Sequence, residues 1–208
     1  LVTAAMARRA GAQVVPNLHV PALPIGSLAS DNWPTQRFDV VVTNPPYVGF
    51  RQLDPSVKDA VRAADPYARS DLAVAFQSRV FGLLADGGLA GTVTPASWTT
   101  GRESLALRRD VLADGGPRVT AALGQRVFDE APLLFIAATV VRRGLSKAYL
   151  AVFRPPGGSG AAGLAAAVLA PRWVPRTTVS SLPLAPFLPV APPGLLSRAS
   201  KGPRVGDL

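Results

Sequence analysis

The sequence lacks cysteine and contains a single histidine, His19. The absence of cysteine excludes disulfides, thiolate metal sites and a cysteine nucleophile. One histidine does not suffice for a histidine-based metal cluster or triad, and we expect His19 to lie in a loop or at a strand end. No apolar run reaches the roughly eighteen residues that a membrane-spanning helix needs. A charged-then-apolar signal peptide is also missing. We therefore expect no metal site and no membrane association.

Lysine is scarce too, occurring only at Lys58, Lys147 and Lys201, so arginine carries almost all of the formal net charge of +9. A basic surplus suits a polyanionic partner such as DNA. However, the bias toward alanine, glycine, proline and arginine is also typical of GC-rich coding sequence, so the charge alone does not decide this point. The 208 residues can hold one α/β domain and little more. Because both Leu1 and Leu208 look like cut ends, we expect a piece of a larger protein.

The most informative stretch is Phe38–Tyr47. Its first part, Phe38–Val42, is a short apolar and β-branched run, which predicts a buried strand of a parallel sheet. Pro45 and Pro46 end that strand because proline has no amide hydrogen for a sheet ladder. An amide side chain, two rigid carbonyls and an aromatic ring therefore follow the carboxyl end of a strand, which is where open α/β sheets bind ligands.

The groups of Asn44–Tyr47 suit chemistry on a nucleobase amine, which is a poor nucleophile because its lone pair is delocalised into the ring. The Asn44 side-chain oxygen and the Pro45 carbonyl can each accept one amine hydrogen, which favours a tetrahedral nitrogen and stabilises its developing positive charge. Tyr47 offers a face on which an extruded base can stack, a contact worth about 1–3 kcal/mol. An isolated Asn-Pro-Pro-Tyr is more often a plain turn; the strand before it favours the functional interpretation.

The remaining sequence predicts alternating helices and strands. The expected helices are Leu1–Ala10, Asp54–Ala64 with Asp54 as N-cap, Asp71–Ala85 capped by Ser70 and ended by Asp86–Gly88, and Gly101–Ala113 after a capping box at Thr100–Glu103. The expected strands are a short one within Val14–Ala22, then Phe38–Val42, Leu89–Thr94, Val119–Leu123, and the hairpin-like pair Leu133–Val141 and Lys147–Phe153. Trp98 is expected in the core or at a pocket wall, with a structural role favoured. Arg102, Arg108 and Arg109 are expected on a solvated face, with phosphate contact as the alternative.

The order of the motifs resembles the later motifs of gamma-type adenine-N6 DNA methyltransferases, above all the large Eco57I-like methylases that include the PglX proteins of BREX phage-defence systems. The matching segments are Asn44–Tyr47, Ser70–Leu72 with Phe76, Asp86–Gly88, Val93–Trp98 and Leu123–Phe128. The resemblance implies an α/β, Rossmann-like methyltransferase fold that is partial, with a mostly parallel sheet, an antiparallel hairpin at its end and helices on both faces. Residues 1–153 would be the C-terminal part of the catalytic domain. Residues 154–208 would be a Pro/Gly-rich linker to a missing target-recognition domain.

The same resemblance assigns roles to individual residues. Asn44, Pro45, Pro46 and Tyr47 would form the catalytic motif. Tyr47 would stack on the flipped base, and Phe128, an aromatic that is more often a core residue, would contact that base from elsewhere in the pocket. The cofactor would be S-adenosyl-L-methionine, with Gly26, Ser27 and Asn44 as the candidate contacts. The glycine-rich turn and the ribose-binding acid of the family do not occur in the chain, so we expect the isolated chain to bind this cofactor poorly.

The implied substrate is double-stranded DNA with a flipped adenine, because a stacked base hides its amine from a methyl donor. Subunits of a restriction-modification or phage-defence system are the other implied partners, in the bacterial cytoplasm. Asn44 favours adenine over cytosine, whose methyltransferases more commonly begin the motif with serine. Two alternatives stay open. One is an amino-methyltransferase acting on protein glutamine or rRNA. The other is a truncated, non-catalytic DNA-binding remnant.

Overall fold

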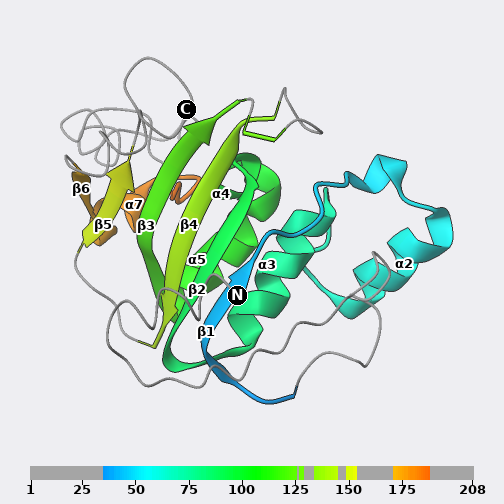
Figure 1. Cartoon of the computed structure of the whole chain (residues 1–208), viewed down its shortest axis with the longest axis horizontal. Helices are drawn as coiled ribbons and strands as arrows, with labels where there is room; N and C mark the ends of the chain where they lie inside the picture. Colours follow the sequence, from blue (N-terminus) through cyan, green and yellow to red (C-terminus); the bar gives the residue numbers. More distant parts are fainter. Residues whose placement is uncertain (1–34, 126, 129–133, 145–148, 154–170, 188–208) are drawn as a thin grey trace, which may run out of the picture.

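A computed structural model describes residues 35–125, 127–128, 134–144, 149–153 and 171–187. The expected helix at 1–10, the short strand within 14–22, Gly26, Ser27 and His19 lie outside these residues. The described strands form one six-stranded sheet in the order β1-β2-β4-β3-β5-β6 (Figure 1). Their bounds are β1 Phe38–Thr43, β2 Leu84–Pro95, β3 Gly115–Gly124, β4 Ile136–Arg143, β5 Tyr149–Phe153 and β6 Arg172–Pro175.

The sheet is mixed, with β1, β2, β3 and β5 running in one direction and β4 and β6 in the other. The predominance of one direction was predicted, but the hairpin between the fourth and fifth strands was wrong. Strand β4 pairs with β2 on one edge and with β3 on the other. Because both its edges are occupied, β4 has none left for β5, which pairs with β3 instead.

The helices that contribute to the main core all cover the same face of the sheet (Figure 1). In that core, Val74 of α3 and Val111 of α5 pack with Ala90 and Val141 of the sheet. The helical bounds are η2 Phe50–Gln52, α2 Pro55–Ala64, α3 Leu72–Gly82, α4 Ser97–Thr100, η3 Arg102–Ser104, α5 Leu105–Ala113 and α7 Arg176–Ser181. The expectation of helices on both faces is therefore not met within the described residues.

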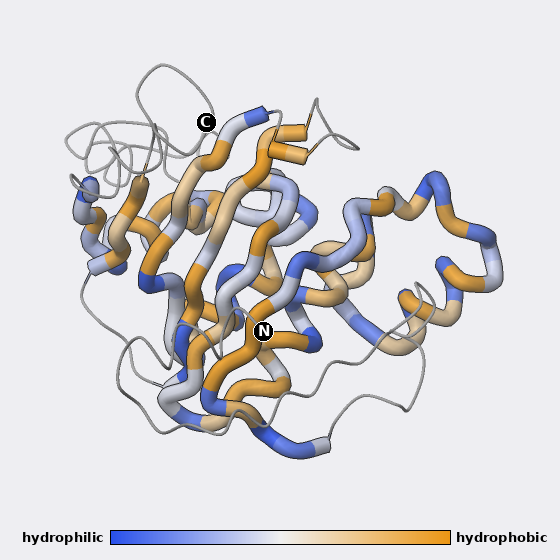
Figure 2. Tube along the Cα trace, in the orientation of Figure 1, coloured by the Kyte–Doolittle hydropathy of each residue, from blue (hydrophilic) through white to orange (hydrophobic). Residues whose placement is uncertain are grey.

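The opposite face of the sheet leaves apolar side chains of β1 exposed. Val40 is 55% exposed and Val42 is 68% exposed, and hydrophobic colour runs along this strand in Figure 2. Within the described residues, β1 is an edge strand with β2 as its neighbour. The prediction of a strand at Phe38–Val42 was right, but the prediction that it is buried was wrong, because no described helix covers this face.

The expected bounds of the third helix differ from those of α3. Asp71, not Ser70, is the N-cap, and its Oδ1 accepts a hydrogen bond from the Val74 amide at 2.9 Å. A carboxylate is a strong cap because it meets both an unpaired amide and the positive end of the helix dipole. The segment Asp86–Gly88, expected to end the helix, lies inside β2. Gly87 has a φ of 79° there, and the β1–β2 register shifts alongside it, so an irregular strand replaces the expected turn.

The expected single helix at Gly101–Ala113 is divided into η3 and α5, and α4 precedes both. The capping box at Thr100–Glu103 is not formed, since the N-cap of η3 is Gly101 without a side-chain bond. Arg108 is fully buried. Its guanidinium donates to the carbonyls of Trp98, Gly101, Leu184 and Ala185 at 2.6–3.2 Å. The solvated face expected for this arginine was therefore wrong.

Residues 171–187 belong to the same folded unit as the sheet, although a linker was expected from residue 154 onward. Strand β6 pairs with β5, and Val179 of α7 joins the main core. The ring of Phe187 is buried edge-on against Trp98, with centroids 5.3 Å apart. Trp98 is thus a core residue, as its structural interpretation predicted. No described helix is long and apolar enough to cross a membrane.

Candidate functional site

The candidate site is the loop Asn44–Tyr47, which follows the last residue of β1. The pairing of β1 with β2 ends at Thr43 and Thr92. Pro45 and Pro46 come next and have no amide hydrogen with which to extend the ladder. Pro45 is buried, whereas the Asn44 side chain is exposed and Tyr47 is partly buried. The backbone of the loop is therefore anchored while its amide group stays accessible.

The Tyr47 hydroxyl connects the loop to the neighbouring strand. It lies 2.6 Å from Asn44 Oδ1 and 3.2 Å from the carbonyl oxygen of Val93, in β2. Burial raises the pKa of Tyr47 above its ordinary value, so the hydroxyl stays protonated at neutral pH and donates. The sequence did not identify Val93 as part of the site. Val93 contributes its backbone carbonyl. Every residue type has this group, so the sequence gives no signal for the role.

Tyr47 and Phe128 lie together, although one follows β1 and the other follows β3. Their ring centroids are 6.0 Å apart and their planes are inclined at 57°. This separation falls within the range of about 4.5–7 Å typical of direct aromatic pairs. The two rings are therefore in contact, and a base must either stack on an outer ring face or separate the pair.

A further aromatic, Phe135, lies at the same end of the sheet and was not singled out from the sequence. The amide of Ala96, directly after β2, donates to the Phe135 carbonyl at 2.7 Å. The Phe135 side chain is 63% exposed. Phenylalanine before a strand gives no sequence signal of function, since it is equally typical of a core.

The expected cofactor contacts are only partly visible. Gly26 and Ser27 lie outside the described residues, and Asn44 is the one member of that set within them. The contacts of Asn44, Tyr47 and Phe128 are to a hydroxyl, a carbonyl and aromatic rings. No carboxylate that could bind the ribose of the cofactor takes part in these contacts. Among the described residues, no cluster of His, Asp or Glu side chains could bind a metal ion.

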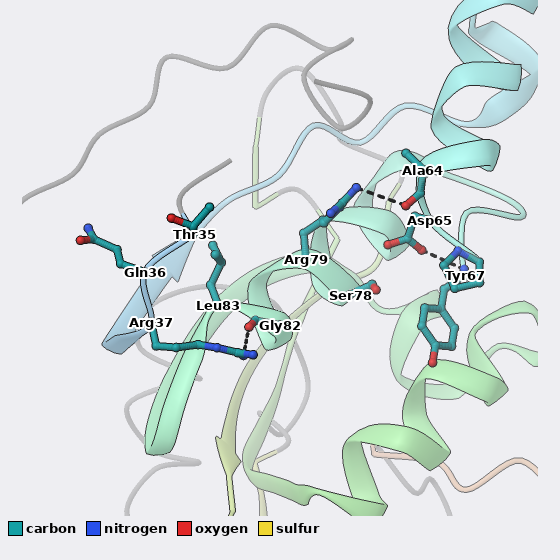
Figure 3. Close-up of a pocket in the computed structure, with 11 residues that line it drawn as sticks. Thr35, Gln36, Arg37, Ala64, Asp65, Tyr67, Ser78, Arg79, Gly82 and Leu83 are labelled. Carbon is teal, nitrogen blue, oxygen red and sulfur yellow. Dashed lines mark hydrogen bonds between the residues drawn. The ribbon is translucent and has the colours of Figure 1, made fainter. Parts of the chain in front are cut away.

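A separate hollow of about 460 Å³ lies at the other end of β1 (Figure 3). It is lined by the segment before β1, the turn between α2 and α3, and the end of α3. Its arginines are directed at backbone carbonyls: Arg37 donates to Gly82, and Arg79 donates to Ala64 at 3.2 Å. Because this hollow precedes β1 and Asn44 follows it, the two are distinct.

Residues 27–128 match the Eco57I restriction-modification methylase family. The adenine-specific methyltransferase BrxX of Escherichia coli O9:H4 (strain HS) is 32% identical over 120 residues, which make up 57% of this chain and 10% of BrxX. The chain thus spans about a tenth of the length of this relative.

Two solved structures show the fold. A type I restriction-modification methyltransferase subunit from Streptococcus thermophilus has a TM-score of 0.51 at 20% identity, covering 69% of this chain and 34% of that one. A Listeria monocytogenes protein assigned to the class I S-adenosylmethionine-dependent methyltransferases has a TM-score of 0.52 at 12% identity, covering 67% and 43%. The expected Rossmann-like α/β methyltransferase fold is confirmed. Residues 27–128 of this chain are thus similar to an Eco57I-like restriction-modification methylase domain.

Proposed function

We propose that the protein containing this chain methylates the N6 amine of adenine in double-stranded DNA, as part of a restriction-modification or phage-defence system. The observation that carries this proposal is the loop after β1. There, the Asn44 amide oxygen, a proline-stiffened backbone and the Tyr47 ring lie beside Phe128. The methylase family match and the similarity to BrxX support the choice of DNA and adenine. Recognition of the target sequence belongs, in the same proposal, to a region that follows residues 154–208.

Asn44 and Pro45 act on the adenine amine. Asn44 Oδ1 has two lone pairs, of which the Tyr47 hydroxyl uses one. The second lone pair accepts one amine hydrogen, and the Pro45 carbonyl accepts the other. Both contacts strengthen as the nitrogen becomes tetrahedral and positive, so they stabilise the transition state more than the ground state. The charge is met by neutral oxygens, and no side chain has to remove a proton before the nitrogen attacks.

The aromatic pair receives the base. An adenine inside a duplex cannot present its amine, so it must leave the stack at a cost of a few kcal/mol. Stacking on Tyr47 or Phe128 offsets about 1–3 kcal/mol of this unstacking free energy. The exposed Asn44 side chain lies next to Tyr47, so a base stacked on this ring has its amine within reach of the amide.

S-adenosyl-L-methionine supplies an electrophilic methyl group when it is bound. The contacts of the loop are to a hydroxyl, a backbone carbonyl and an aromatic ring, which suit a base, and Gly26 and Ser27 lie outside the described residues. This part of the site therefore fits the target base, and Asn44, Pro45, Tyr47 and Phe128 act on that base.

The proposal is tested with the full-length protein and its Asn44→Ala variant. Genomic DNA from cells expressing each protein is sequenced with a method that detects N6-methyladenine. We expect adenine methylation with the wild-type protein and none with Asn44→Ala, while DNA affinity in a gel-shift assay changes less than about twofold. Asn44→Ala removes one of the two acceptors for the amine hydrogens, and loss of one such transition-state group costs about 2.7–4 kcal/mol of activation free energy.

The matched control is Gln36→Ala, which removes an exposed amide at the other end of β1. We expect this variant to methylate like the wild-type protein. Retained methylation in Asn44→Ala would refute the assignment of the loop. Methylation of protein glutamine or rRNA instead of DNA would refute the proposed substrate.

A further inference from the structure

We propose that the Tyr47 hydroxyl is a positioning group, which orients the Asn44 amide so that its oxygen faces the amine of the target base. This inference rests on the proposed function, and it assigns Tyr47 a second task besides stacking. The ring offers a face to the base, whereas the hydroxyl acts on Asn44. The two tasks use different atoms of one side chain and can therefore be separated by substitution.

The geometry provides the first argument. Asn44 is exposed, and a free asparagine amide in water rotates and exchanges the places of its oxygen and nitrogen at little cost. The Tyr47 hydroxyl, 2.6 Å from Asn44 Oδ1, restricts this freedom, because the phenol donates to the amide oxygen in the observed arrangement. One lone pair of Oδ1 is then fixed on the phenol, and the other is left in a defined direction.

The second argument is that the hydroxyl itself has a fixed position. It lies 3.2 Å from the Val93 carbonyl, one residue beyond the last β1–β2 pair. The prolines of the loop have no amide hydrogen to give to β2 at this point. The hydroxyl therefore lies between a strand carbonyl and the amide, and a single hydrogen serves both acceptors. The hydroxyl thereby fixes the orientation of the Asn44 amide relative to β2, the strand next to the loop.

The test compares Tyr47→Phe with Tyr47→Ala in the full-length protein. Tyr47→Phe keeps the ring and removes the hydroxyl, whereas Tyr47→Ala removes both. Three quantities are measured on an oligonucleotide duplex carrying a mapped target adenine, the third of them on the same duplex with 2-aminopurine in place of that adenine. They are the single-turnover rate of methylation at saturating DNA, the dissociation constant for the duplex, and the fluorescence of 2-aminopurine at the target position, which reports base extrusion.

For Tyr47→Phe we expect the methylation rate to fall on the order of tenfold, as the loss of one hydrogen bond implies. The dissociation constant and the 2-aminopurine signal should stay within about twofold of the wild-type values. For Tyr47→Ala we expect the 2-aminopurine signal to fall as well, because the stacking face is gone. A purely structural role of the hydroxyl would lower the methylation rate and base extrusion together. A lower methylation rate with unchanged extrusion therefore supports the positioning role.

Two results overturn the inference. One is a Tyr47→Phe rate within about twofold of the wild-type rate. The other is a loss of extrusion in Tyr47→Phe as large as its loss of rate. In both cases, methylation by the wild-type protein leaves the proposed function standing. If the wild-type protein methylates no adenine, the proposed function itself fails, and the positioning role fails with it.

Discussion

Arg108 of α5 donates two hydrogen bonds to the carbonyl of Leu184, at 3.2 Å from Nε and 2.7 Å from Nη2. The same guanidinium donates to the carbonyls of Trp98, within α4, and Gly101, directly after it. One buried side chain thus joins the last described segment of the chain to the turn that follows β2. Burial lowers the pKa of Arg108 to about 10, so the guanidinium remains charged at neutral pH.

Replacing Arg108 with methionine should therefore destabilise the fold. Methionine fills much of the same volume but leaves several buried carbonyls without a donor, and each unpaired group costs about 1–3 kcal/mol. We expect a loss of at least about 3 kcal/mol, seen as a lower thermal unfolding temperature and faster proteolysis within Leu182–Phe187. The neighbouring Arg109 is exposed, so Arg109→Met is the matched control and should unfold like the wild-type protein. Equal unfolding temperatures for the two variants would contradict the role of Arg108.

Phe128→Ala should weaken methylation through the target base. The contact with Tyr47 shows that Phe128 borders the loop, and loss of one base-stacking aromatic costs about 1–3 kcal/mol. We expect kcat/KM for a target duplex to fall about tenfold or more and the 2-aminopurine signal to fall with it. Trp173→Ala removes an exposed aromatic from β6 and should leave both readings unchanged. Wild-type kinetics in Phe128→Ala would show that Phe128 has no part in the pocket.

Asp65→Asn should alter how stability depends on pH. Asp65 is 3% exposed and accepts a hydrogen bond from the Tyr67 amide at 2.8 Å. Desolvation raises the pKa of Asp65, outweighing the hydrogen bonds and the nearby Arg79 that act in the other direction. The folded state therefore holds this proton more tightly than the unfolded state. The resulting stabilisation is complete below the ordinary carboxyl pKa of about 3.9 and is lost as pH rises through the folded-state value.

The asparagine variant keeps the oxygen acceptor and cannot ionise. We expect its unfolding temperature, relative to that of the wild-type protein, to rise with pH from about 4 upward and then to level off. Asp59→Asn, which replaces an exposed carboxylate of α2, is the matched control variant. A difference between Asp65→Asn and the wild-type protein that does not change with pH would contradict the raised pKa.

The isolated 208-residue chain should bind S-adenosyl-L-methionine poorly or not at all. From the sequence pattern we expect neither a glycine-rich strand-to-helix turn nor the acid that would hold the cofactor ribose in this chain. Titration calorimetry of the isolated chain should show no saturable heat at micromolar cofactor. A micromolar dissociation constant would mean that other residues of this chain supply the missing contacts.

Local chemistry allowed parts of the structure to be predicted from the sequence. The strand at Phe38–Thr43, its end at two prolines, and the helix α2 with Asp54 as N-cap and Pro55 at its first position all depend on residues that are neighbours in the chain. The motif order from Asn44 to Phe128 likewise predicted the methylase family. For such features the backbone preferences of single residues suffice, although the Asp54 side chain makes no capping hydrogen bond.

Other features depended on which elements became neighbours in space. The insertion of β4 between β2 and β3, the burial of Arg108 and the packing of residues 171–187 join segments that lie far apart in the chain. The site itself divides in the same way. Local sequence determined that an amide, two prolines and a tyrosine follow β1. Only the tertiary structure placed the Val93 carbonyl and the Phe128 ring against Tyr47, because hydrogen bonds and ring contacts between separate strands form only once the sheet has assembled.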